Sequence, residues 1–241
     1  MASMDSSLLA SACSGCWQQL EIILGPSPQL LEGLTALEGD SALHVVAAFG
    51  DDADADDNFR KSADVVYGKA KRLLFVQNKK GDTPLHCAAR AGSSRMVALL
   101  TDFAKAEHRA KELLETENKL GETALHEAVR IGSNVIVNLL MEEDQELASL
   151  PRDGVSPLYL AILSEDTVIA ETLHAKSATG MLSYSGPNGQ NALHAGVLRG
   201  EEQREYILLK IITQKCLRQL SRYMDTTDLY FLYAKKNWNY S

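Results

Sequence analysis

One short motif recurs five times along the chain and restricts the possible folds more than any other feature. The copies read GDSALHVVAAFG, GDTPLHCAARAG, GETALHEAVRIG, GVSPLYLAIL and GQNALHAGVLRG, and their leading residues are Gly39, Gly81, Gly121, Gly154 and Gly189. These glycines lie 42, 40, 33 and 35 residues apart. A motif that returns at such a period indicates a solenoid, in which each unit packs mainly on its neighbours.

Each part of the motif has a physical reason to be there. Gly81 can adopt a positive φ in a hairpin, Thr83 can accept a backbone N–H at a helix start, and Pro84 suits the first helical turn. Small residues such as Ala88 fall on one helical face and let the next unit approach closely. The motif therefore predicts an all-α solenoid of about six helix pairs with hairpin tips, spanning residues 6–213.

A second apolar segment follows most copies of the motif, as at 96–100, 135–140 and 207–212, and predicts the second helix of each pair. Together the two helices should close a continuous core. We predict these core residues: Leu43, Ala47, Leu85, Ala88, Leu99, Leu100, Leu125, Ala128, Leu139, Leu140, Leu158, Ala161, Leu193 and Leu208.

The two ends of the chain depart from the motif. Residues 1–38 contain two apolar segments, at 7–10 and 20–24, which predict a divergent N-terminal capping repeat ahead of the five repeats at 39–213. Residues 214–241 form a non-repeat tail rich in aromatic side chains. Three interpretations of the tail stay open: it caps the last repeat, it binds a partner, or it is a frayed end.

The first two intervals are long because they contain insertions. An acidic loop at about 51–61 is predicted between paired helices; it resembles a calcium loop in its alternating aspartates, but Asp57 and Ala63 occupy positions where such a loop needs Gly and Glu. A solvated acidic loop is the preferred interpretation. The second insertion, around 105–114, is rich in Ala, Lys, Glu and Leu and predicts a longer second helix or an added turn.

A histidine recurs once per repeat, at His44, His86, His126 and His194, and Tyr159 replaces it in the fourth copy. Stacked helices lie about 10 Å apart, too far for several of these side chains to bind one zinc ion at about 2 Å. We therefore predict that the imidazoles bridge neighbouring hairpins by hydrogen bonds and do not form a metal ladder.

No other pattern supports an enzyme. The sequence lacks the nucleophile, phosphate-binding, dinucleotide-binding and zinc-protease motifs, so we predict neither catalysis nor a cofactor. Cys13 and Cys16 form a single CxxC without a second one, and they leave a zinc- or redox-responsive protein as the alternative interpretation.

Composition limits the setting and the partners. The chain has 32 acidic against 24 basic residues, which would repel a nucleic-acid backbone. Four irregularly spaced cysteines do not suggest a disulfide framework, and no apolar run reaches the roughly 18 residues of a membrane span. We expect a cytoplasmic protein that has no membrane span in this chain and binds no nucleic acid.

The motif and its period resemble the ankyrin repeat. Residues 67–200, with runs such as LLMEEDQELASL and LSYSGPNGQNALHAGVLRG, further resemble plant ankyrin proteins of the accelerated-cell-death type, especially those of grasses. That resemblance implies protein–protein interaction in immune signalling, salicylic-acid responses and cell death. Members typically continue with more repeats and a membrane-spanning domain known as PGG, so we expect this chain to be a truncated form, located at membranes only through partners.

The resemblance implies three possible roles: a soluble scaffold, a decoy, or an effector-binding protein. Its partner would be a signalling protein, a full-length ankyrin relative or a pathogen effector. Binding is predicted at the hairpin tips and the exposed side of the first helices: Lys79, Lys80, Asp82, Arg90, Leu120, Glu122, Glu127, Arg130, Arg152, Asp153, Val155 and Asn188. Arg90 and Arg130 occupy equivalent sites and predict a basic spot that receives an acidic partner.

Overall fold

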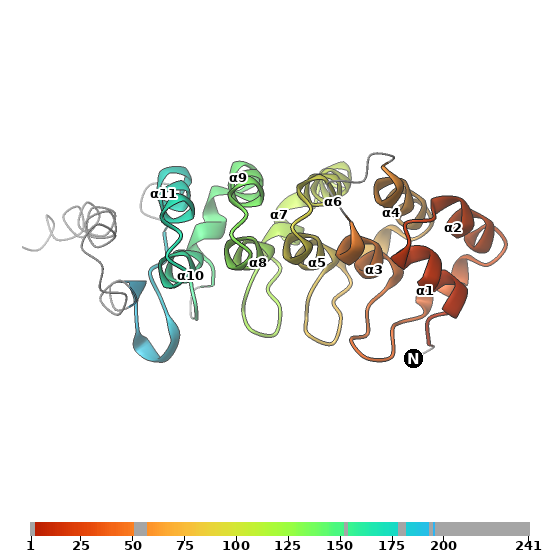
Figure 1. Cartoon of the computed structure of the whole chain (residues 1–241), viewed down its shortest axis with the longest axis horizontal. Coiled ribbons are helices and arrows are strands. Elements are labelled where there is room, and N and C mark those ends of the chain that lie inside the picture. Colours follow the sequence, from red (N-terminus) through yellow and green to blue (C-terminus); the bar gives the residue numbers. More distant parts are fainter. Residues whose placement is uncertain (1–2, 51–56, 152–153, 178–181, 193–194, 196–241) are drawn as a thin grey trace, which may run out of the picture.

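The computed structural model describes residues 3–50, 57–151, 154–177, 182–192 and 195. This part of the chain is all-helical, with eleven α-helices, no β-strand and two isolated β-bridges. The predicted all-α class is therefore confirmed. The helices form a single elongated row (Figure 1).

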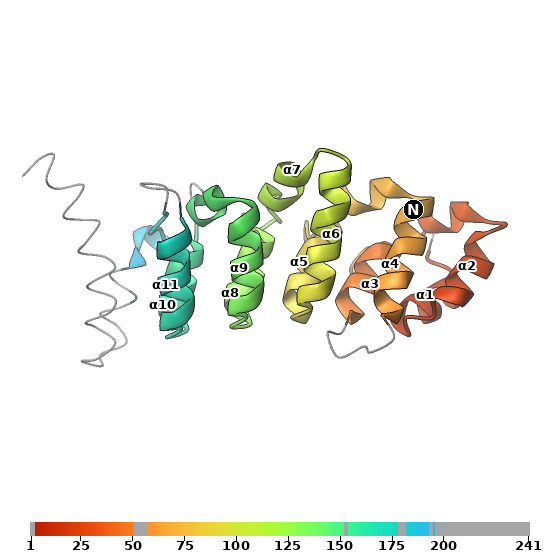
Figure 2. The ribbon, with the colours of Figure 1, turned by 90° about the horizontal axis from the view of Figure 1, so that it is seen from above.

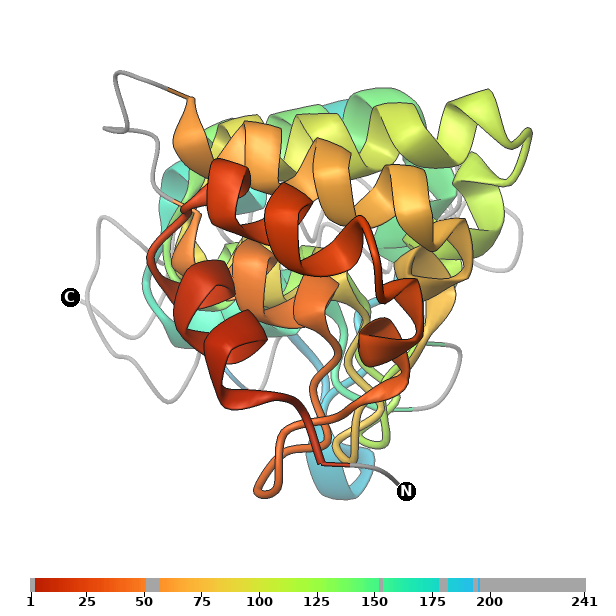
Figure 3. The same ribbon diagram turned by 90° about the vertical axis from the view of Figure 1, so that its right-hand side faces the viewer.

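The row has two layers of helices. The first helices of the pairs are α1 (Ser6–Cys13), α3 (Ala42–Phe49), α5 (Pro84–Ala91), α8 (Ala124–Arg130) and α10 (Pro157–Leu163). The second helices are α2 (Trp17–Leu24), α4 (Asn58–Lys69), α6 (Ser94–Ala106), α9 (Asn134–Glu143) and α11 (Thr167–Lys176). The hairpin tips project from the layer of first helices, and in the view along the row they gather on one side (Figures 1 and 3). Five of the predicted pairs lie in the described chain, and most of the sixth, at 189–213, lies outside it.

Local signals set the helix boundaries as predicted. Thr83 is the N-cap of α5, Pro84 is its first residue, and Gly92 ends it in the left-handed conformation with φ of 80°. The second helix α6 then begins because the Ser93 side chain accepts a hydrogen bond from the Met96 backbone N–H at 3.2 Å. The motif and the serine that follows it therefore determine where the first helix begins, where it ends and where the second helix begins.

One continuous core fills the space between the layers. Of the predicted core residues, Leu139 is only partly buried, Leu193 and Leu208 lie outside the described residues, and every other one is buried. Helices α3 and α5 and helices α5 and α8 pack directly on each other. Each repeat thus covers the apolar face of the previous one, as expected of a solenoid.

The insertions take definite positions. Helix α4 begins at Asn58, inside the predicted acidic loop at 51–61, while residues 51–56 lie outside the described chain. The second insertion does both things that its sequence predicts: α6 is extended, and a short helix α7 (Ala110–Glu115) follows. Figure 2 shows α7 beyond the end of α6. The 3₁₀ turns η2 (Lys71–Phe75) and η3 (Gln145–Ser149) likewise follow α4 and α9.

The described chain begins with a helix pair and ends in a 3₁₀ turn and the residues next to it. The two apolar segments of residues 1–38 are helices α1 and α2, followed by the 3₁₀ turn η1 (Pro28–Glu32). A last 3₁₀ turn, η4 (Pro187–Gly189), forms the tip at Gly189. The tail at 214–241 lies outside the described residues. Within those that are described, no helix has the length and apolar character required to cross a membrane.

Candidate partner-binding surface

Backbone hydrogen bonds link the hairpin tips into a row. The Lys79 N–H donates to the Glu38 carbonyl at 2.8 Å, and the Lys119 N–H donates to the Lys80 carbonyl at 2.9 Å. Gly81 has a φ of 83°, and a Cβ there would lie 2.7 Å from the Lys119 backbone nitrogen. A side chain at position 81 would therefore separate two neighbouring tips. All five leading glycines have a positive φ, which explains why the motif begins with glycine.

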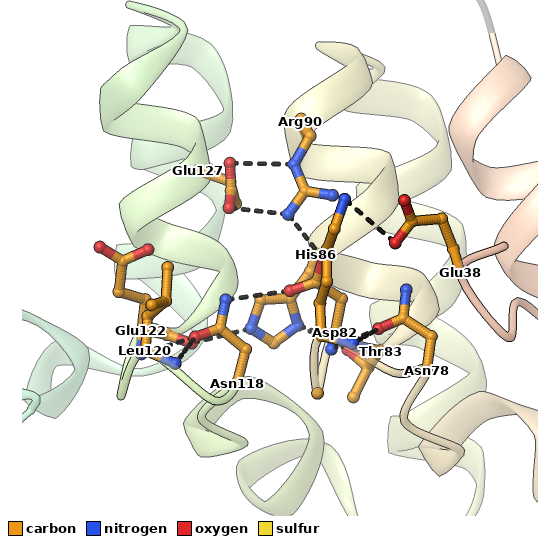
Figure 4. A network of polar contacts seen from close by, with 12 residues as sticks. Glu38, Asn78, Asp82, Thr83, His86, Arg90, Asn118, Leu120, Glu122 and Glu127 are labelled. Carbon is orange, nitrogen blue, oxygen red and sulfur yellow. Dashed lines mark hydrogen bonds and ion pairs between the residues drawn. The ribbon is translucent and has the colours of Figure 1, made fainter.

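One asparagine closes each of the second and third tips and connects it to the previous tip. The Asn118 Oδ1 accepts from the backbone N–H groups of Leu120 and Glu122 at 2.9 and 3.1 Å, and its Nδ2 donates to the Asp82 Oδ1 at 2.9 Å. Asn78 repeats this arrangement one tip earlier, where its Nδ2 donates to Asp40 at 2.7 Å. Figure 4 shows both asparagines beside the tips they close. Pro151 precedes the fourth tip, so no equivalent amide reaches Glu122.

The recurring histidines join the repeats, as predicted from the sequence. His44, His86 and His126 each lie 2.9 Å, through Nε2, from a carbonyl of the following hairpin, those of Asp82, Glu122 and Val155 respectively. Nδ1 faces the N-cap of the same helix, as where the Thr83 backbone N–H donates to His86 at 3.2 Å. His194 lies outside the described residues.

This geometry selects the neutral imidazole. A backbone N–H can only donate and a carbonyl can only accept, so Nδ1 is the acceptor and Nε2 carries the proton. Burial lowers the pKa of all three histidines, and it lowers that of His126 to about 4. Tyr159 takes the histidine position in the fourth repeat, and its hydroxyl donates to the Gln190 Oε1 at 2.6 Å.

A cluster of five charged side chains lies behind the tips. Three of them are on helices α5 and α8, and Asp82 and Glu122 precede the N-caps of these helices. The Arg90 guanidinium donates to Asp82 at 2.7 Å and to both Glu127 oxygens at 2.8 and 3.2 Å (Figure 4). Arg130 donates to Glu122 at 2.6 Å and lies 3.2 Å from Glu127. Since Arg90 is on α5 and Glu127 on α8, the cluster ties two repeats together.

The cluster corrects two predictions about this surface. Asp82, Glu122 and Glu127 were expected on the exposed side of the first helices, but all three are buried because they pair with the arginines. The predicted basic spot is also wrong in sign: two arginines against three carboxylates give the cluster a net charge of −1. Each arginine side chain keeps 41% of its area exposed.

The pairing with arginine favours the charged form of the Asp82 and Glu127 carboxylates. Burial alone would raise the pKa of Asp82, but hydrogen bonds from Arg90 and Asn118 outweigh it and leave this pKa below its ordinary value. Desolvation would likewise raise the pKa of Glu127, but the hydrogen bond from Arg90 and the positive charges of Arg90 and Arg130 together lower it. Asp82 and Glu127 therefore hold the Arg90 guanidinium in a fixed position while part of it stays exposed.

The other predicted site residues divide by position. Lys79, Lys80, Leu120 and Asn188 are exposed at the tips, while Val155 is half-buried. Arg152 and Asp153 lie outside the described residues. The Lys79 Nζ donates to the carbonyls of Ala36 and Leu37, and Lys80 pairs with Glu38 at 3.2 Å.

Of the exposed apolar side chains that flank this surface, sequence reasoning predicted Leu120 and missed Leu37, Phe49 and Ile131. Leu37 occupies the first tip with 86% of its area exposed, and Leu120 occupies the third with 75%. Phe49 is the last residue of α3 and is 53% exposed, and Ile131 is the C-cap of α8 and is 41% exposed. The alignment of the five motifs carried the signal, because Phe49 and Ile131 occupy the same motif position directly before a glycine.

The cysteine alternative gains little from the geometry. Cys13 ends α1 and Cys16 is the N-cap of α2, and burial raises the pKa of the Cys13 thiol, which disfavours the reactive thiolate. Among the residues that the structure describes, the one trio of potential metal ligands is elsewhere, at Glu115, Asp144 and Glu146. There the Lys111 Nζ lies 2.6 Å from a Glu146 oxygen and already supplies the compensating charge.

Comparisons with known proteins agree with the repeat geometry. Residues 63–149 match the family model described as ankyrin repeats (3 copies). No curated protein matches the chain. Among solved structures, the ankyrin repeat domain of Bcl-3, described as a unique member of the IkappaB protein family, is similar with a TM-score of 0.66 at 20% identity, covering 88% of this chain and 86% of that one.

The human ASB11 ankyrin repeat domain is similar with a TM-score of 0.62 at 18% identity, covering 86% of this chain and 84% of that one. At such identities these likenesses show the fold alone. The chain therefore contains ankyrin repeats arranged as a solenoid, an architecture that serves as a non-catalytic scaffold for protein–protein interaction.

Proposed function

We propose that this chain binds a partner protein along the row of hairpin tips and the adjoining ends of the first helices. The observation that carries the proposal is the exposure of Leu37 and Leu120 at tips whose backbones are bonded into a rigid row. Large apolar side chains on a preorganised surface lose little entropy on binding, and exposed apolar groups together mark interaction sites.

The proposed surface keeps the residues predicted from the sequence but assigns them different tasks. Lys79, Lys80, Leu120 and Asn188 contact the partner, together with the exposed parts of Arg90 and Arg130. Asp82, Glu122 and Glu127 hold those arginines in place from beneath, as their burial and ion pairs support. Val155 adds to the surface at the fourth tip, and Arg152 and Asp153 stay predicted contacts from their place in the sequence beside Gly154.

We place this binding in plant immune or cell-death signalling, with the chain acting as a scaffold, a decoy or an effector-binding protein. The support is the resemblance of residues 67–200 to plant ankyrin proteins of the accelerated-cell-death type. The partner would then be a signalling protein, a full-length ankyrin relative or a pathogen effector, met in the cytoplasm or beside a membrane.

Affinity capture from plant tissue tests the proposal. The whole chain is compared with the variant Lys79→Glu/Lys80→Glu/Leu120→Asp and with a control, Lys69→Glu/Arg72→Glu, which reverses two exposed charges away from the tips. The tip variant should lose the captured protein while the control keeps it. Equal capture by all three would refute binding at the tips, and a version ending at residue 213 shows whether the tail contributes.

A further inference from the structure

We infer that Asp40, at the base of the first tip, receives an arginine side chain from the partner protein. This inference rests on the proposed function and specifies the partner's chemistry. It starts from a regularity of the repeats, in which an acidic residue and an arginine eight positions later form a pair. Arg90 donates to the Asp82 Oδ2 at 2.7 Å, and Arg130 donates to the Glu122 Oε1 at 2.6 Å.

The first repeat keeps the acid and lacks the arginine. Asp40 occupies the position of Asp82, but the residue eight positions later is Ala48, which is exposed. The Asp40 Oδ1 accepts from the Asn78 Nδ2 at 2.7 Å, just as the Asp82 Oδ1 accepts from Asn118 at 2.9 Å. The two carboxylates are therefore held alike, and the oxygen that binds a guanidinium in the second repeat has none in the first.

No neighbouring cation in the described chain takes the place of the missing arginine. Lys80 pairs with Glu38 at 3.2 Å, and the Lys79 Nζ donates to the carbonyls of Ala36 and Leu37. Asp40 itself is half-buried, so a partner's side chain can reach it. An ionised carboxylate with one free oxygen on a fixed frame is complementary to an incoming cation.

The described side chains around Asp40 favour a single arginine from the partner, because they offer no second carboxylate at the position equivalent to that of Glu127. Glu127 on α8 supplies the second carboxylate for Arg90. The same position on α5, next to the first repeat, is Cys87, a thiol that stays neutral because burial raises its pKa to about 12. Phe49, which follows Ala48 as the last residue of α3, is an exposed aromatic side chain. A planar guanidinium can both bond to a carboxylate and stack on an aromatic ring, whereas a lysine ammonium is a more strongly hydrated point charge.

The geometry can be tested by supplying the arginine from the chain itself. Ala48→Arg should restore the pair and raise the melting temperature by about 2 °C, while Ala48→Gln controls for side-chain bulk. The gain should disappear in the double variant Ala48→Arg/Asp40→Asn. A gain that is independent of Asp40, or no gain relative to Ala48→Gln, would overturn the inference because the two positions would not be coupled as in the second repeat.

Binding is tested with a small probe. N-acetylarginine methylamide is titrated into the isotope-labelled full chain, and the amide signals of residues 40, 48 and 78 are followed by NMR, with the isosteric neutral citrulline analogue as control. Saturable shifts with a Kd in the millimolar range are expected for arginine alone. Ala48→Arg and Asp40→Asn should each weaken that binding at least about tenfold.

The outcomes separate this inference from the proposed function. Equal shifts with citrulline, or unchanged binding in Ala48→Arg, would overturn the inference and leave partner capture at the tips unaffected. Arginine-specific shifts that both variants abolish would support it, even if captured proteins proved independent of Lys79 and Lys80.

Discussion

Polar contacts join neighbouring repeats on both layers of the solenoid, but the inner and outer contacts are built differently. On the inner side, beside the tips, His86 reaches the Glu122 carbonyl and Asn118 reaches Asp82, all in buried positions. On the outer side, Lys71 pairs with Glu107 and Lys105 with Glu143, each at 2.5 Å and with the lysines 63% and 43% exposed. Both sets connect residues one repeat apart.

The difference shows which contacts fix the architecture. When a buried hydrogen bond is broken, its partner keeps the full desolvation penalty, whereas an exposed ion pair is replaced by water. The buried inner contacts therefore determine how neighbouring repeats pack, whereas the exposed outer ion pairs add little to the stability of that packing. The following predictions test this ranking from the largest expected effect to the smallest.

The apolar core between the layers should dominate both sets of contacts. Leu125 on α8 is fully buried, so Leu125→Ala should lower the free energy of unfolding by about 2–5 kcal/mol through lost burial and the remaining cavity. Leu120→Ala, at an exposed tip, is the matched control and should change it by less than about 0.5 kcal/mol. Chemical denaturation of both variants measures the difference; equal losses would contradict the assignment of Leu125 to the core.

Acid should weaken the inner contacts through the histidines. The pKa of His126 falls from 6.5 in the unfolded chain to about 4 in the folded one, so the unfolded state binds the proton first. The stabilisation is complete above pH 6.5 and is lost as the pH falls from 6.5 towards 4. Between pH 7.5 and pH 5 the part due to His126 is about 2 kcal/mol, at about 1.4 kcal/mol per pKa unit.

Chemical denaturation of wild type and His126→Gln at pH 7.5 and pH 5 isolates the pH-dependent stabilisation that is due to His126. The variant should be less stable at pH 7.5 but should lose about 2 kcal/mol less on acidification. His44 and His86 remain in both proteins and shift in the same direction, so their contribution cancels in the comparison. An identical pH dependence would show that His126 is not held neutral by its carbonyl partner.

The repeated parts of the structure could be predicted from the sequence because the same residue types recur at the same positions of the five motif copies. Helix starts at Thr83, turns at Gly81 and the bridging of hairpins by the histidines all follow from positions that recur in register. The added helix α7 was also predictable, since its composition favours a helix whatever its neighbours. Local propensity and periodicity are properties of short segments, which a single sequence displays directly.

The charged cluster could not be predicted in the same way. The position of Glu127 is occupied by Val45, Cys87 and Leu160 in the other described repeats, so the motif gives it no fixed chemistry. Its partner Arg90 lies 37 residues earlier, and the pairing depends on how two helices pack. A charged residue on a first helix therefore suggested an exposed site, whereas the fold buries it against an arginine.

Removing an arginine of the charged cluster should lower the free energy of unfolding by less than removing a histidine contact and by more than removing an outer ion pair. Arg90→Gln removes the partner of Asp82 and Glu127, and we expect a loss of about 1–2 kcal/mol, below the 3–5 kcal/mol of a fully buried pair because the arginine is 41% exposed. Arg130→Gln should cost less, because Arg130 pairs only within its own repeat. A larger loss for Arg130→Gln would show that the link between repeats through Arg90 adds nothing.

The outer ion pairs should have the smallest effect. Lys105→Ala removes the pair with Glu143 across α6 and α9, yet both groups are partly exposed and water replaces the contact, so we expect a loss of less than about 0.5 kcal/mol. Salt supplies the control: 1 M NaCl should remove most of the difference between Lys105→Ala and wild type but little of that between Arg90→Gln and wild type, because buried pairs are screened less. If Lys105→Ala were as costly as Arg90→Gln and equally insensitive to salt, the outer layer would hold the repeats together as firmly as the inner one.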